Sequence, residues 1–433
     1  MRTSEATTTR RPPWMWLLAL LIVVAAVAPL VLQWLSNADD QRLVDLDVYR
    51  TGGQALLRGQ PVYDFVTPAP QLLPFTYPPI AAMLATPLAM MSWPLAQWVW
   101  TAGVFAALAV AVGYGFRAVS GRAAGPYPDE TPSGATSGAS GLRLPLLFAF
   151  LMVACTYLMP IRDQVRFGQV DILLVALCLA DCVARRPVWP RGTLIGLAVA
   201  VKLTPGVFLI HLLITGFGPG AREEQRRTLF MAAFTAALLT LLPFLVIPGD
   251  AADFWFRALF DPERLGANAA TTNQSMRGML IRLYLPDQPT ALIWLALVAV
   301  VGWYGFRHAR GALLDGHPVA ATALVGLMAV LLSPVAWIHH LAWVVVVLGA
   351  LAGDGRDPVR LRVAAGVWLY YVLPIPWWGV AIKAAEVPVL SPVLGKIVQN
   401  GFGLGALALV WLLGVWLPRR REAFRALPDR ALS

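Results

Sequence analysis

Apolar segments separated by short polar connections run along almost the whole chain. A helix that spans a bilayer needs about 20 mostly apolar residues, and thirteen segments reach or approach that length. They cover residues 14–35, 77–92, 94–119, 143–160, 168–184, 192–203, 205–217, 229–248, 289–306, 318–336, 340–353, 362–380 and 397–417. The pattern predicts an all-α, polytopic integral membrane protein, with residues 1–433 forming a single domain.

Basic residues concentrate in the short connections between these segments and near both ends of the chain. Because arginine and lysine are enriched in cytoplasmic loops, we expect the tails 1–13 and 418–433 to be cytoplasmic. Two ends on one side require an even number of crossings, so at least one segment does not span. We expect about twelve transmembrane helices, with 77–92 and the proline-interrupted stretch 192–217 as the short or broken segments.

Composition agrees with a membrane protein. Hydrophobic residues make up 58% of the chain and charged residues only 13%, whereas a soluble domain carries about a quarter charged residues. The net charge of +10 lies in the loops, so we expect a lipid bilayer as partner, no nucleic acid and no obligate protein partner. The cysteines Cys155, Cys178 and Cys182 lie in hydrophobic segments without a ligand set and are interpreted as small apolar residues.

Three short polar motifs stand at the ends of apolar segments. They are Asp45–Arg50, Lys202–Pro205 and Ser333–His340. Ionisable groups at membrane depth are costly and mark a functional site by default. We therefore expect the outer loop 36–76, which carries the first motif, to be catalytic and to contain a short helix on the membrane surface.

The first motif offers two acids. Asp45 is a candidate general base, because a carboxylate near the membrane surface can take a proton from an acceptor hydroxyl. The alternative is a solvated acid or a helix N-cap. Asp47 is its local rival, since a surface helix that buries Val44 and Val48 points the two acids in different directions.

The other two motifs offer cationic and imidazole groups. Lys202 interrupts an apolar helix, where it can hold a phosphate or reach toward an interface. Either His339 or His340 can hydrogen-bond a phosphate or a sugar hydroxyl, and an interfacial polar turn is the alternative reading. No further ligands accompany the two histidines in sequence, so we expect no metal and no cofactor.

Polar connections elsewhere add further candidates. Arg166 or Arg162 can help to bind a phosphate, while Asp163 is interpreted as an ion-pair partner of an arginine. The run Asn273-Gln274-Ser275 can hydrogen-bond a sugar or form an ordinary polar loop. The Gly/Ser/Pro-rich stretch 120–142 is interpreted as a linker without chemistry.

Taken in order, the motifs are more specific than any one of them. They read Asp45-Leu-Asp47-Val-Tyr49, Gly59-Gln-Pro-Val-Tyr63-Asp64, Phe75-Thr-Tyr77-Pro-Pro79, Gly168-Gln169-Val-Asp171, Lys202-Leu-Thr-Pro205, Asn273-Gln274-Ser275 and Ser333-Pro-Val-Ala-Trp337-Ile-His339-His340. This ordered set resembles the bacterial polyprenyl-phosphate-mannose-dependent α-(1→2)-mannosyltransferases, a GT-C type family of actinobacterial envelope enzymes. The resemblance covers residues from about 14 to 417.

The resemblance implies a GT-C fold and an inverting transfer of mannose from a polyprenyl-phosphate-mannose donor. The acceptor would be a mannosylated phosphatidylinositol glycolipid, and the reaction would take place on the outer face of the plasma membrane. The family's base falls on Asp45, its phosphate-side cation on Lys202 and its imidazole on His339 or His340. Arg166 joins the expected phosphate-binding residues from its place in the polar connection alone. The motifs also supply the expected substrate-binding residues, which are Asp47, Tyr49, Tyr77, Gln169, Asn273, Gln274 and Trp337.

One position departs from the family pattern, and other functions stay open. Related sequences commonly carry Asn where this chain has Asp171, which therefore stays outside the expected site. A lipomannan-branching enzyme, another lipid-linked sugar, a secondary transporter and a flippase or envelope scaffold are the alternatives. A transporter would usually show inverted repeats and acids inside helices, whereas the acids here are expected in the outer loops.

Overall fold

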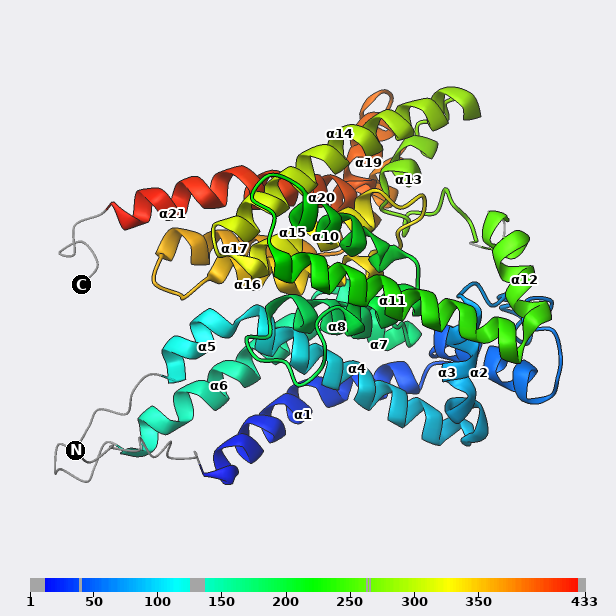
Figure 1. Cartoon of the computed structure of the whole chain (residues 1–433). Coiled ribbons are helices and arrows are strands. Elements are labelled where there is room, and N and C mark those ends of the chain that lie inside the picture. The colour runs from blue at the N-terminus through cyan, green and yellow to red at the C-terminus, as the bar shows by residue number, and fades with distance from the viewer. Residues whose placement is uncertain (1–11, 39–40, 125–136, 262–263, 265, 427–433) are drawn as a thin grey trace.

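The computed structural model describes residues 12–38, 41–124, 137–261, 264 and 266–426 (Figure 1). Within these ranges the regular elements are helices, and β-structure is limited to two isolated bridges, Val66 with Pro74 and Asn273 with Trp337. The all-α fold predicted from the apolar segments is therefore confirmed.

Each predicted segment contains a helix. The longer helices are α1 (Pro13–Leu35), α4 (Trp93–Gly115), α6 (Ser137–Thr156), α11 (Glu223–Val246), α14 (Asp287–Leu314), α15 (Pro318–Leu331), α17 (Pro358–Val372) and α20 (Gly401–Trp411). Shorter ones are α3 (Pro79–Met90), α8 (Asp171–Val183), α9 (Thr193–Val201), α10 (Val207–Phe217), α16 (Val344–Ala352), α18 (Ile375–Ala384) and α21 (Leu417–Arg425). The polar connections hold α2 (Val44–Leu57), α5 (Arg117–Ala124), α7 (Met159–Phe167), α12 (Pro248–Phe256), α13 (Met276–Ile281), α19 (Leu390–Gln399) and the short helix η4 (Ile338–Trp343).

By length and composition, five described helices can cross a membrane, or up to seven if each of two bent pairs is one span. The bends are 77° between α6 and α7 and 51° between α17 and α18. The single segment expected at 362–380 is therefore broken, at Leu373-Pro374, because proline disfavours helical geometry in the residue before it. The protein is polytopic, while the expected count of about twelve spans is not confirmed.

Burial separates central helices from peripheral ones. Every residue of α16, and every residue of α15 from Ala320 to Leu331, is buried. In the apolar windows of α1 and α11 only 22% and 17% of the residues are buried. Apolar side chains that stay exposed over whole helices are typical of surfaces that face lipid.

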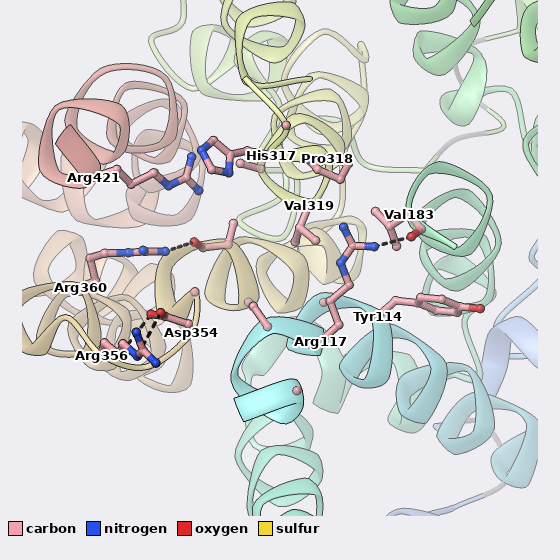
Figure 2. Close-up of a pocket in the computed structure, with 18 of the residues that line it drawn as sticks. Tyr114, Arg117, Val183, His317, Pro318, Val319, Asp354, Arg356, Arg360 and Arg421 are labelled. Carbon is pink, nitrogen blue, oxygen red and sulfur yellow. Dashed lines mark hydrogen bonds and ion pairs between the residues drawn. The ribbon is translucent and has the colours of Figure 1, made fainter. Parts of the chain in front are cut away.

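The two ends of the bundle differ in character (Figure 1). Helices α2, α3 and α12 gather at one end, while α5 and α21 lie at the other. The second end is rich in arginine and opens into a cavity (Figure 2). Of the expected tails and linker, residues 418–425 belong to α21, residues 120–124 and 137–142 are helical, and 1–11, 125–136 and 427–433 lie outside the described residues.

Candidate active site

A short helix, as expected, lies within residues 36–76 as α2, and its first turn rests on the connection between α7 and α8. The amide of Leu43 donates to the carbonyl of Arg166 at 3.1 Å. Gly168 has φ +71°, and a Cβ atom there would lie 2.8 Å from Cβ of Leu46. A glycine is therefore required at this position, and the close approach carries Asp45 toward the neighbouring Gln169.

Gln169 joins Asp45 to two buried tyrosines. Its Oε1 accepts hydrogen bonds from the hydroxyls of Tyr49 at 3.1 Å and Tyr77 at 3.3 Å, and these hydroxyls are 3.0 Å apart. With Oε1 engaged in this way, the amide nitrogen is the atom left to donate to the Asp45 carboxylate, and a side-chain hydrogen bond links the two residues. Three of the predicted substrate-binding residues thus orient the candidate base.

The electrostatic surroundings of Asp45 raise its pKa to about 7. Burial is the largest cause, because it disfavours the charged form of a carboxyl group. The Gln169 hydrogen bond and the positive charge of Lys202 act in the opposite direction, and the negative charge of Asp171 adds to the rise. A carboxyl group whose pKa lies near neutrality is suited to accept a proton during a reaction.

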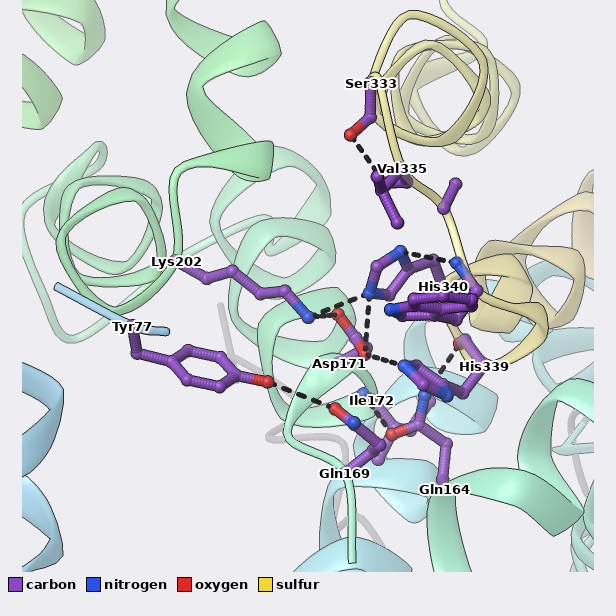
Figure 3. A network of polar contacts seen from close by, with 12 residues as sticks. Tyr77, Gln164, Gln169, Asp171, Ile172, Lys202, Ser333, Val335, His339 and His340 are labelled. Atoms are coloured by element: carbon purple, nitrogen blue, oxygen red, sulfur yellow. Dashed lines mark hydrogen bonds and ion pairs between the residues drawn. The ribbon is translucent and has the colours of Figure 1, made fainter. Parts of the chain in front are cut away.

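Lys202 lies at a break between two helices. Helix α9 ends at Val201, Lys202 is extended with φ −151° and ψ 133°, and a helical turn begins again at Thr204. From this break its ammonium nitrogen reaches Oδ1 of Asp171 at 2.7 Å and Nε2 of His340 at 3.0 Å (Figure 3). It also lies 5.3 Å from the centre of the Tyr77 ring.

The turn before α16 holds the two histidines in different environments. The amide of Trp337 donates to Nδ1 of His340 at 3.2 Å, which assigns the proton of the neutral ring to Nε2. This nitrogen and the Lys202 ammonium, 3.0 Å apart, are then two donors that need a common acceptor. The side-chain amide of Gln164 donates a hydrogen bond to the backbone carbonyl of His339 at 2.7 Å. Nε2 of His339 lies 3.8 Å from Oδ2 of Asp171. His340 is therefore the imidazole next to the lysine, a choice that the sequence left open.

The arrangement suits an anionic oxygen. While Lys202 is charged, its ammonium and the Nε2–H of His340 are donors only 3.0 Å apart, and one phosphate oxygen can accept from both. Two further atoms of the cluster, Oδ2 of Asp171 and Nε2 of His339, are buried and lack a hydrogen-bond partner among the described residues. The cluster therefore has hydrogen-bonding capacity left for a bound group.

Three side chains of the cluster also have the chemistry of metal ligands. Asp171, His339 and His340 offer ligand atoms that all lie within 4.8 Å of one another. However, the Lys202 ammonium already contacts two of these residues. An ammonium ion there performs the charge-balancing role that a divalent cation would have, and a metal would first have to displace it.

Two predicted residues lie apart from this cluster. Asp47 is half-buried, and the charge that acts on its carboxyl group is that of Arg50, not that of Lys202. Arg166 is exposed and stacks over the ring of Phe167, with its guanidinium carbon 5.0 Å from the ring centre. Because the two aspartates of α2 meet different surroundings, Asp45 is the acid that faces the cluster.

Asn273 and Gln274 are engaged by protein atoms. Asn273 donates to the carbonyl of Asn268 at 2.9 Å and accepts from the amides of Ser275 and Ala336. Gln274 bonds Thr271, Gln399 and Gly403. Both side chains are fully buried. Their geometry favours a structural role, which is to hold the Trp337 segment and thus the histidine turn in place.

Three residues of this region lie outside the site expected from the sequence, and one of them, Asp171, was considered there and set aside. Asp171 carried a signal, because a buried lysine needs a counter-charge and the Gly168–Asp171 connection supplies one. Gln164 carried none that a single sequence reveals. Arg282 is 2% exposed and donates to Asn400, Ala270 and Asn273, so it braces the loop that supports Trp337.

Comparison with known families and proteins agrees with this chemistry. A family model described as glycosyltransferase family 87 matches residues 75–334, more than half of the chain. The matched range contains Tyr77, Gln169, Asp171 and Lys202, whereas Asp45 and the histidine pair lie outside it.

Curated relatives match over most of the chain. It is 36% identical over 348 residues to the polyprenol-phosphate-mannose-dependent alpha-(1-2)-phosphatidylinositol mannoside mannosyltransferase of Mycolicibacterium smegmatis, covering 77% of this chain and 76% of that protein. The enzyme of the same name from Mycobacterium tuberculosis is 33% identical over 374 residues, or 84% and 83% of the two chains. A polyprenol-phosphate-mannose-dependent alpha-(1-2)-phosphatidylinositol pentamannoside mannosyltransferase of M. smegmatis is 30% identical over 366 residues, or 83% and 81%. No solved structure matches.

Proposed function

Because the chain belongs to glycosyltransferase family 87, we propose that it transfers mannose from polyprenol-phosphate-mannose to a phosphatidylinositol mannoside, with an alpha-(1-2) linkage. The names of the relatives from M. smegmatis and M. tuberculosis support this donor and acceptor. The relative named for a phosphatidylinositol pentamannoside is less similar, at 30% identity. We therefore prefer the acceptor named for the more similar relatives, a phosphatidylinositol mannoside, to the pentamannoside.

The observation that carries this proposal is the meeting of a base and a cation in one cluster. Asp45 has a pKa of about 7, and Lys202 acts on it electrostatically while its ammonium contacts His340. Group transfer from a lipid phosphate needs both functions, a base for the acceptor hydroxyl and positive charge for the departing phosphate. A structural scaffold needs neither function.

The proposed reaction uses each group at a stated atom. The Asp45 carboxylate removes the proton of the acceptor hydroxyl, whose oxygen attacks the anomeric carbon from the face opposite the phosphate. The bond between that carbon and the phosphate oxygen breaks, and the phosphate leaves with the electron pair. The ammonium of Lys202 and the Nε2–H of His340 stabilise the growing negative charge. Attack from the opposite face inverts the anomeric centre.

The proposed site faces the outside of the plasma membrane. Helix α2, which carries Asp45, lies at the end of the bundle opposite α5 and α21 (Figure 1). Those two helices contribute arginines, including Arg117, Arg122 and Arg420. Positive charge favours the cytoplasmic side, so the end with α2 would be the outer one.

Incubation of the purified protein with matched donors and acceptors tests the proposal. Polyprenyl-phosphate-mannose and polyprenyl-phosphate-glucose are each supplied with a phosphatidylinositol mannoside and with a phosphatidylinositol pentamannoside, and the product linkage is analysed. We expect a 1,2-linked mannose on the mannoside. Transfer of glucose instead would refute the donor, preference for the pentamannoside would refute the acceptor, and no transfer from any pair would refute the proposal.

A further inference from the structure

A large cavity opens at the end of the bundle opposite the candidate active site (Figure 2). Its volume is about 1020 Å³, and it lies among the ends of α4, α8 and α16, helix α5, the starts of α15 and α17, and the last turns of α21. Six arginines and one acid line it, namely Arg117, Arg185, Arg356, Arg360, Arg421, Arg425 and Asp354. The described lining therefore carries a strong excess of positive charge.

Protein contacts neutralise little of this charge. Arg360 donates to the carbonyls of Ala350 and Leu351, each at 2.9 Å, and Arg117 donates to a carbonyl of α8. Carbonyl groups satisfy hydrogen bonds without cancelling a full charge. Arg356 lies 3.8 Å from Asp354 in an exposed pair. Three lining arginines, Arg185, Arg421 and Arg425, form no ion pair with the described residues.

His317, in the turn between α14 and α15, reports the same positive field. Its pKa is lowered to about 4, first by burial and then by the charges of Arg421 and Arg425. Protonation of the His317 imidazole is therefore unfavourable, because it would add a further positive charge to the cavity wall. An anion in the cavity would relieve the repulsion among these groups.

The cavity is also amphipathic and lies at the depth where apolar helices end. Val110, Val183 and Val319 line it together with Ala350, next to the arginines. Helix α4 ends at Gly115 and α15 begins at Pro318, both beside the cavity. Lipid headgroups are expected where apolar helices of a membrane protein end. Basic pockets between helices at this level suit lipid phosphates.

We propose that this cavity binds the phosphate group of an anionic membrane lipid, with the arginines around the phosphate and the valines against the first part of the lipid chains. Free inorganic phosphate shares the same chemistry but would make no use of the apolar wall. The site is separate from the proposed catalytic cluster and does not depend on the proposed function.

Calorimetric titration of the purified full-length chain in a neutral detergent tests this proposal. The probes are short-chain phosphatidylglycerol, short-chain phosphatidylcholine and inorganic phosphate. We expect phosphatidylglycerol to bind more tightly than either of the others. The double variant Arg421→Gln/Arg425→Gln should weaken that binding by about tenfold or more, since each basic residue near a lipid surface contributes about 1 kcal/mol.

Matched variants separate the site from general charge and from folding. Arg186→Gln/Arg362→Gln removes two exposed arginines that do not line the cavity and should leave binding unchanged. Arg421→Lys/Arg425→Lys should restore most of it, and thermal unfolding in detergent checks that each variant folds. Equal binding of phosphatidylcholine, equal binding by the double variant, or inorganic phosphate binding as tightly as phosphatidylglycerol would each overturn the lipid site.

Discussion

The ammonium nitrogen of Lys202 lies 2.7 Å from Oδ1 of Asp171, and both side chains are largely buried. Burying two charges is costly, and removing one partner leaves the other uncompensated. The pair therefore depends on both members, and it holds the lysine where it contacts His340 and acts on Asp45. It connects the helix break after α9 with the start of α8.

This pairing predicts how the pH dependence of the reaction responds to Asp171→Asn. Asp45 acts only when deprotonated, so the wild-type rate should rise with pH through about 7, the pKa of Asp45. The negative charge of Asp171 raises that pKa. Removing the charge should therefore move the rising limb to lower pH, while Asn still accepts a hydrogen bond from Lys202. Rate–pH profiles of the two proteins measure the shift.

Asp47→Asn is the matched control for that shift. It removes a carboxylate from the same helix that lies beside Arg50 and apart from the groups that set the pKa of Asp45, so the midpoint of the limb should stay in place. An unchanged midpoint in Asp171→Asn, or an equal shift in both variants, would contradict the proposed coupling.

Lys202→Met should affect both the rate and its pH dependence. Without the ammonium, the departing phosphate loses its main cation, and kcat should fall about 100- to 1000-fold. The positive charge also lowers the pKa of Asp45, so the residual activity should rise at higher pH than in the wild type. Lys202→Arg, which keeps the charge, should keep the midpoint near the wild-type value. If the activity left in Lys202→Met rose at lower pH than that of the wild type, Lys202 would not lower the pKa of Asp45 as proposed.

The two histidines should differ in their effect on catalysis. His340 contacts Lys202, whereas His339 contacts Phe167 and is held through its backbone by Gln164. We expect His340→Ala to lower kcat by about 100-fold and His339→Ala to lower mainly the thermal stability. Parallel kinetics and thermal unfolding of the two variants measure this. The reverse order of effects on kcat would assign the catalytic imidazole to His339.

Removal of divalent metal should leave the transfer rate unchanged, because Lys202 supplies the positive charge within the triad of Asp171, His339 and His340. The measurement is the rate after treatment with a chelator and gel filtration, with and without added Mg²⁺, Mn²⁺ or Zn²⁺. Activity that disappears with the chelator and returns with one metal would show that the triad holds a metal in the working enzyme.

The helices were predictable because an apolar run in a membrane has few alternatives to helix. What the pattern did not reveal is where helices break. Lys202 is conspicuous in an apolar segment, but its extended backbone between α9 and η1 (Thr204–Gly206) depends on neighbours that the sequence does not position. The bend at Leu373-Pro374 had a local signal in Pro374, which the hydrophobic run of 362–380 obscured.

The site was predictable where an ionisable residue, which is costly to place at membrane depth, interrupts an apolar segment. Asp45, Lys202 and the histidine pair each interrupt an apolar context, whereas Gln164 and Arg282 act through backbone carbonyls that only the fold brings near. Asn273 and Gln274 resemble sugar-binding residues in sequence, yet their polar atoms are bound by protein groups. The type of a side chain shows which hydrogen bonds it can form, and the fold decides whether a protein group or a substrate is the partner.

The most direct test of the central claim is single-turnover transfer by Asp45→Asn, with donor binding measured on the same purified protein. Asn has nearly the same shape as Asp but cannot accept the proton of the acceptor hydroxyl. We predict that the donor binds as in the wild type while the transfer of mannose slows by about 100- to 10,000-fold and loses its rise through pH 7. Transfer at the wild-type rate, with the same pH dependence, would contradict the assignment of Asp45 as the base.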